Sequence, residues 1–193
     1  MLPETLALHL PGNAEKTRRL FVALLPDRHT KEKLASVQKK IAGRKTPPEN
    51  FHLTLFFLGN QPESILFPLK NFMDRVTFDP FVLSLDKTGY FSKIRLSWIG
   101  PTEIPPGLVQ LHNTPRQFMV PAYLEDKRES FRPHVTLARK SLPPSVKITS
   151  PVVWTVDRLA LMESILSKEP GRHPQYRIMH EKTANTPTEY PDI

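Results

Sequence analysis

Two apolar segments of the chain share one pattern, and their histidines lie 82 residues apart. The first is FHLTLFFLGN, residues 51–60, and the second is FRPHVTLARK, residues 131–140. In each, a histidine is followed by an apolar residue, a threonine and a leucine. Because residues i and i+2 of a β-strand point to the same face, each segment predicts a strand that sends a histidine and a threonine to one face and apolar side chains to the other.

The two pairs are His52 with Thr54 and His134 with Thr136. With 7 His and 15 Thr in 193 residues, chance gives about 0.5 such pairs, and about 0.02 once the apolar middle residue and the following leucine are required. A third pair, His112-Asn113-Thr114, has a polar middle residue, and we interpret it as part of a helix end. The matched pair therefore indicates a shared role.

An imidazole and a hydroxyl side by side can hold two oxygens of one phosphate, and two such strands that face each other would surround it. Two alternatives stay open. A strand histidine is often a satisfied structural side chain. Two histidines could also be metal ligands, although neither strand offers a nearby carboxylate to complete the usual ligand set.

Bulk composition bounds the class of protein. A chain of 193 residues suits one domain with a real core. It has no cysteine, which excludes disulfides, thiolate nucleophiles and cysteine-bound metals. The net charge of +8 favours an anionic partner such as nucleic acid, or provides solubility only. Without a signal-peptide pattern or a long apolar run, we expect a cytoplasmic monomer.

The order of predicted elements is typical of an α+β fold. We expect strands at residues 19–27, 52–60, 78–91, 94–100, 134–139, 152–164 and 173–182, and helices at 29–43, 63–76 and 105–120. Thr30 is the expected cap of the first helix, and Pro115 should break or bend the third. We expect a flexible extension over residues 1–16, one domain over 17–182 with a weak two-fold repeat, and a flexible tail over 183–193.

These residues resemble a known family. HLTL at 52–55 and HVTL at 134–137 match the paired motifs of the two-histidine phosphoesterases. The segments RLFVALLPD, PPENFHLTLFFLGN, RLSWIG, SFRPHVTLARK and VDRLALMES resemble the bacterial RNA 2′,3′-cyclic phosphodiesterases, long called 2′-5′ RNA ligases. The resemblance covers about residues 18–182. It implies a bilobal, pseudo-symmetric fold in which two antiparallel sheets flank a central cleft, with helices outside and no metal or cofactor.

The resemblance also implies a mechanism. His134 would be the base that activates water, His52 the acid that protonates the leaving 3′-oxygen, and the product a 2′-phosphate. Thr54 and Thr136 would donate hydrogen bonds to the non-bridging oxygens. Attack by a 5′-hydroxyl in place of water would join RNA ends through a 2′-5′ linkage, with no need for the ATP site that the sequence lacks.

Three further residues are candidate substrate contacts. We expect Arg139, at the end of the second strand, to reach a phosphate, and Phe57 or Phe91 to stack on a terminal base. Two other functions stay open: an esterase for small cyclic nucleotides or ADP-ribose cyclic phosphates, and an RNA-binding protein with a vestigial site.

Overall fold

The computed structural model describes residues 15–118, 131–167, 169 and 171–185. The described strands are β1 (Thr17–Leu24), β2 (Arg44–Lys45), β3 (Leu53–Pro62), β4 (Phe81–Leu85), β5 (Lys87–Phe91), β6 (Leu96–Gly100), β7 (Val135–Arg139), β8 (Val152–Val156), β9 (Arg158–Ile165) and β10 (Gln175–Thr183). The α-helices are α1 (Arg28–Gln38), α2 (Leu66–Arg75) and α3 (Pro106–Phe118). This set of strands and helices confirms the α+β class.

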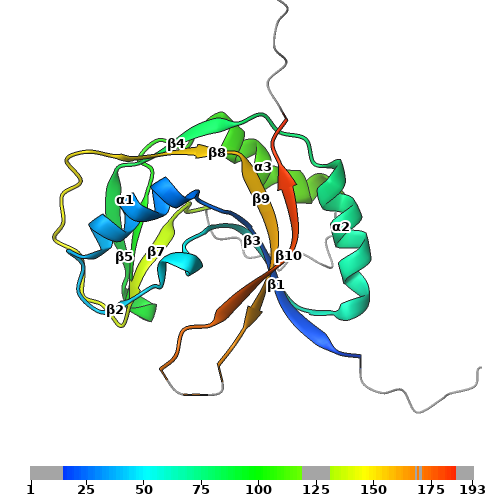
Figure 1. The fold of residues 1–193 in the computed structure, drawn as a ribbon, viewed down its shortest axis with the longest axis horizontal. Helices are drawn as coiled ribbons and strands as arrows, with labels where there is room; N and C mark the ends of the chain where they lie inside the picture. The colour runs from blue at the N-terminus through cyan, green and yellow to red at the C-terminus, as the bar shows by residue number, and fades with distance from the viewer. Residues whose placement is uncertain (1–14, 119–130, 168, 170, 186–193) are drawn as a thin grey trace, which may run out of the picture.

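One antiparallel sheet of eight strands carries both histidine motifs. Its order is β10-β9-β1-β3-β7-β6-β5, with β2 paired to β7, while β4 and β8 form a separate two-stranded sheet (Figure 1). The central strands β3 and β7 are partners at a single residue pair, Leu53 with Val135. The two expected antiparallel sheets are therefore halves of one sheet, joined where the motifs lie.

The main core covers one face of this sheet. Leu53, Leu55, Val135 and Leu137 are buried in it, as the strand pattern predicts. Helix α1 packs beside β7, α2 beside β10 and α3 beside β3 (Figure 1). Helices α1 and α3 thus support the two strands that carry the motifs, and α2 supports the edge strand β10.

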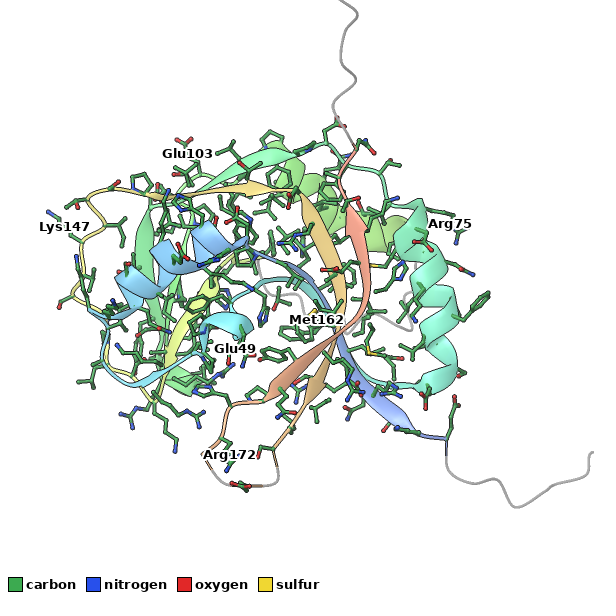
Figure 2. The ribbon with its side chains drawn as sticks, viewed as in Figure 1. Glu49, Arg75, Glu103, Lys147, Met162 and Arg172 are labelled. Carbon is green, nitrogen blue, oxygen red and sulfur yellow. The ribbon has the colours of Figure 1, made fainter. Side chains whose placement is uncertain are left out.

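A smaller apolar cluster lies on the opposite face of the same sheet. Phe21, Ala23, Ala160 and Met162 form it, and Tyr176 packs against it. Figure 2 labels Met162 near the middle of the molecule, where β9 crosses β10 in this view. We call this side of the sheet the site face, because His52, Thr54, His134 and Thr136 also point to it.

Several helix limits differ from the prediction. Helix α1 ends at Gln38, and its cap is Asp27, whose carboxylate accepts a 2.6 Å hydrogen bond from the backbone N–H of Thr30. The assignment of Thr30 as the cap is wrong because the helix starts earlier and places this residue in the first turn. A helix break at Pro115 is also wrong, since α3 continues to Phe118. Pro115 lacks a backbone N–H, yet the helix continues for three residues beyond it.

The last described strand continues slightly into the expected tail. β10 includes Thr183, and the backbone N–H groups of Ala184 and Asn185 donate to the carbonyls of Asp157 and Phe78. Residues 1–14 and 186–193, which hold most of the expected extension and tail, lie outside the described residues. No helix in the described part of the chain is long and apolar enough to cross a membrane.

Candidate active site

The two histidines occupy equivalent positions. Each stands one residue before its strand, and each ring is held by the backbone two residues upstream. Nδ1 of His52 lies 2.7 Å from the carbonyl oxygen of Asn50, and Nδ1 of His134 lies 2.7 Å from that of Arg132. Because a carbonyl oxygen only accepts, Nδ1 carries the hydrogen in both rings, and Nε2 is left to accept or donate a proton.

The strand register brings the motifs together. Their middle residues, Leu53 and Val135, are antiparallel partners and fully buried. Side chains opposite one another on an antiparallel pair point to the same face. The register therefore sets each histidine opposite the threonine of the other motif, with all four polar side chains on the site face. Such an arrangement has approximate two-fold symmetry around one point.

A β-bulge follows each threonine. In β3, Leu55 has no partner between two paired residues of β1, and in β7, Leu137 has none between two paired residues of β6. One extra residue reverses the alternation of side chains beyond it. As a result, the fifth residue after each histidine, Phe57 in one motif and Arg139 in the other, points to the site face instead of the core.

Aromatic side chains flank His52. Its ring centroid lies 4.9 Å from Tyr176, in an edge-on contact, and 5.1 Å from Phe21. Phe57 is 54% exposed and lies 6.0 Å from Phe21. The predicted stacking residue is thus part of an aromatic surface that continues from the first histidine to solvent.

His134 has a corresponding aromatic wall. Phe91 meets its ring edge-on at 5.0 Å, and Trp98 lies 6.1 Å away. Trp98 lies against Gly89 on the adjacent strand β5, where an added Cβ would come within 2.1 Å of the indole. The glycine therefore gives the indole room on the site face.

The environment weakens both histidines as bases. Burial lowers the pKa of His52 to about 4, and the charges of His134 and Arg139 act in the same direction against the hydrogen bond to Asn50. Burial also lowers the pKa of His134, again with help from Arg139. Both rings are consequently neutral at neutral pH in the free protein.

Arg139 lies close enough to influence both histidines. Its charge also acts on Tyr176. Burial raises the pKa of the Tyr176 hydroxyl, while the charge of Arg139 and its hydrogen bond to that hydroxyl lower it. The residue expected to contact a phosphate thus lies near enough for its charge to lower the pKa of both rings. No group of three or more His, Cys, Asp or Glu side chains suited to a metal ion occurs in the described parts of the chain.

Comparisons with known proteins match this geometry. Residues 24–98 fit a family described as LigT like phosphoesterase. A protein of Archaeoglobus fulgidus named RNA 2′,3′-cyclic phosphodiesterase is 32% identical over 154 residues, which cover 76% of this chain and 82% of the relative. The chain belongs to the LigT-like phosphoesterase family. This result confirms the resemblance seen in the two motifs.

Other members of the LigT-like family agree over most of the chain. A Thermus thermophilus protein named RNA 2′,3′-cyclic phosphodiesterase is 30% identical over 180 residues, 84% of this chain and 88% of its own length. The crystal structure of E. coli LigT in apo form has a TM-score of 0.75 and 27% identity, covering 90% of this chain and all of that one. The same protein complexed with 3′-AMP also has a TM-score of 0.75, at 26% identity.

Within this LigT-like fold, sequence reasoning missed three aromatic residues of the site: Phe21, Trp98 and Tyr176. Alternation along a strand could have shown which face of the sheet each of these residues occupies. Phe21, for example, stands between the core residues Leu20 and Val22 and so points to the opposite face. Alternation does not reveal which strands are neighbours, so it could not place these rings beside the histidines.

The third His-x-Thr pair has a different place in the structure. His112 lies in the middle of α3, so the prediction of a helix is confirmed and the prediction that this pair marks the helix end is wrong. Its Nδ1 is 3.0 Å from the carbonyl oxygen of Leu55, the bulged residue of the first motif. Its ring stacks at 3.8 Å on Phe131, three residues before His134. This side chain thus connects α3 to both motif segments.

Proposed function

We propose that this chain hydrolyses 2′,3′-cyclic phosphate ends of RNA to 2′-phosphates, with His52 and His134 as the acid–base pair. The observation that carries the proposal is the matched pair of rings, each anchored at Nδ1 by a backbone carbonyl and each opposite the threonine of the other motif. The names of several relatives, RNA 2′,3′-cyclic phosphodiesterase, support the same reaction.

The proposed step is an in-line displacement at phosphorus. Nε2 of His134 takes a proton from water as the water oxygen bonds to phosphorus. The bond from phosphorus to the 3′-oxygen breaks, and Nε2 of His52 gives that oxygen a proton. One proton is taken and one is given, and the 2′-oxygen keeps the phosphate.

The low pKa of His52 bears on its role as the acid. A ring with a pKa of about 4 carries no proton to give at pH 7. A bound cyclic phosphate adds a negative charge beside the ring and so raises that pKa. We therefore propose that His52 takes up its proton together with the substrate, and that the free site waits with two neutral rings.

The remaining site residues have supporting roles in this proposal. Thr54 and Thr136 donate to the non-bridging oxygens, where charge builds up in the transition state. Arg139 contributes a fixed positive charge beside the phosphate. Phe57 and Phe91 offer stacking surfaces for bases on the two halves of the sheet.

A ligation reaction follows from the same groups. A 5′-hydroxyl in place of water, with the same proton transfers, would form a 2′-5′ linkage at the expense of the strained ring. The cytoplasmic location and the monomeric state expected from the sequence stay predictions.

Phosphorus NMR of the product tests the proposal. An RNA oligonucleotide with a 2′,3′-cyclic phosphate end should give a 2′-phosphomonoester, and both His52→Ala and His134→Ala should reduce turnover about 10²- to 10⁴-fold. The exposed His29 on α1 offers a matched control, since His29→Ala should keep full activity. A 3′-phosphate product would contradict the assigned directions, and full activity in both motif variants would refute the mechanism.

A further inference from the structure

Two arginines stand directly opposite each other next to the proposed site. Arg44 of β2 and Arg139 of β7 are antiparallel partners, so their Cβ atoms are about 5 Å apart and their side chains share a face. That face is the site face, because the bulge at Leu137 directs Arg139 there. Like charges placed opposite one another destabilise a strand pair unless an anion lies near them.

No carboxylate neutralises this pair among the residues that the structure describes. Arg44 donates a hydrogen bond to the carbonyl of Gly171, but its Nε is buried and has no partner in the described part of the chain. Arg139 interacts with the neutral Tyr176 hydroxyl. Within the described residues, the two guanidinium groups therefore have positive charge that no carboxylate neutralises, and Arg44 has an N–H donor without a partner.

A neutral histidine lies near the two arginines. Burial lowers the pKa of His173 and the charges of Arg44 and Arg139 lower it further, against smaller opposing effects of a backbone hydrogen bond at Lys45 and of the Glu49 charge. The ring is therefore an uncharged hydrogen-bonding group at neutral pH. The chain just before β10 is also held by the segment between β2 and β3, since Nδ2 of Asn50 donates to the carbonyl of Pro174 at 3.0 Å. His173 is therefore held next to both arginines.

The position of the two arginines near the histidine motifs indicates which anion they bind. Arg139 acts on the proposed catalytic rings, and Arg44 lies opposite it on the neighbouring strand β2, on the same face. An RNA strand that ends at the rings carries its next phosphate one nucleotide away. Paired guanidinium groups bind phosphate oxygens through several charge-assisted hydrogen bonds.

We propose that Arg44, together with Arg139 and His173, binds the phosphodiester that joins the last two nucleotides of an RNA substrate. The inference rests on the proposed function and deepens it. The site would then distinguish an oligonucleotide end from a cyclic mononucleotide, which has no such phosphate. The occupant is an internal phosphate of the same strand whose end is hydrolysed.

A binding experiment tests this subsite without turnover. The ligands are two dinucleotides that end in a 2′-phosphate, one joined by a natural phosphodiester and one by an uncharged methylphosphonate with a 2′-O-methyl group. Calorimetry should show that the wild-type protein binds the phosphodiester at least about ten-fold more tightly. In Arg44→Gln the ratio should fall to about one.

The matched control is Arg75→Gln, which removes the same charge from α2, on the opposite side of Figure 2 from the labels of Glu49 and Arg172. This variant should keep the wild-type ratio. The logarithmic salt dependence of phosphodiester binding should also flatten by about 0.7 in Arg44→Gln, the share of one phosphate contact on a single strand. A wild-type ratio near one, an unchanged ratio in Arg44→Gln, or no binding of either dinucleotide would overturn the proposal.

Turnover separates this inference from the proposed function. If the wild-type protein hydrolyses cytidine 2′,3′-cyclic phosphate but shows no preference for the charged dinucleotide, the subsite is refuted and the reaction stands. If it hydrolyses neither this nucleotide nor an RNA oligonucleotide with a 2′,3′-cyclic phosphate end, the reaction is refuted, and the binding ratio still decides the subsite.

Discussion

Acid pH should destabilise this protein through His52. The folded protein lowers the pKa of this ring from 6.5 to about 4, mainly by burial. Below pH 6.5 the unfolded chain therefore gains a proton that the folded chain does not bind, and stability falls as pH falls until the folded ring is also protonated near pH 4. Above pH 6.5 the ring has no effect on stability.

The size of the effect follows from the two pKa values. A full shift from 6.5 to about 4 corresponds to about 3 kcal/mol, of which about 2.5 kcal/mol is lost between pH 7.0 and pH 4.5. His52→Asn removes the titrating group, and its side-chain amide can still donate to the carbonyl of Asn50. The wild-type protein should thus lose about 2.5 kcal/mol more than His52→Asn over this pH range.

Urea unfolding at the two pH values measures this difference. Other titrating groups contribute nearly equally to both proteins, so they cancel in the comparison. His29→Asn, at an exposed position of α1, should keep the wild-type dependence on pH. An equal loss of stability in the wild-type protein and His52→Asn would show that the ring is not held neutral. It would also refute the proposal that His52 gains its proton with the substrate.

Three further predictions concern the site. Thr54→Val and Thr136→Val should each lower kcat about 10²-fold in steady-state assays with unchanged circular dichroism, and an unchanged kcat in both would argue against the hydroxyls as donors. Gly89→Ala should lower the free energy of unfolding by about 1–3 kcal/mol, since its Cβ would meet the indole of Trp98 at 2.1 Å; unaltered urea unfolding would contradict this packing. His112→Phe keeps a ring for stacking but loses the bond to the bulge, so kcat should fall while KM changes little, and a wild-type kcat would show that the bond does not position the motif.

The strand pattern predicted much of the site. Alternation in the two motif segments predicted that the histidines and threonines share one face, and the structure places them so. The same alternation, continued past Thr54, would send Phe56 to the site face and Phe57 to the core. The bulge at Leu55 reverses this order, because β3 has one residue more than β1 at that point. Phe56 accordingly packs against the core, while Phe57 is exposed.

Local signals were less reliable at the helix ends. Asp27 and Thr30 are both good cap residues, and the structure uses the earlier one. Pro115 is a strong helix breaker in general, yet α3 extends beyond it. In both cases the neighbouring chain decided between alternatives that the local sequence permits.

The sequence by itself determined the two histidine–threonine strands, the α+β class and the family. Side-chain periodicity and motifs depend only on residues that are close together in the chain. Only the tertiary structure decided that the strands meet at Leu53 and Val135, and that bulges turn Phe57 and Arg139 to the site face. It also decided that Arg44 stands opposite Arg139. The physical reason is that a period of two specifies the face of a strand, whereas its neighbour and its register depend on hydrogen bonds to residues far away in the chain.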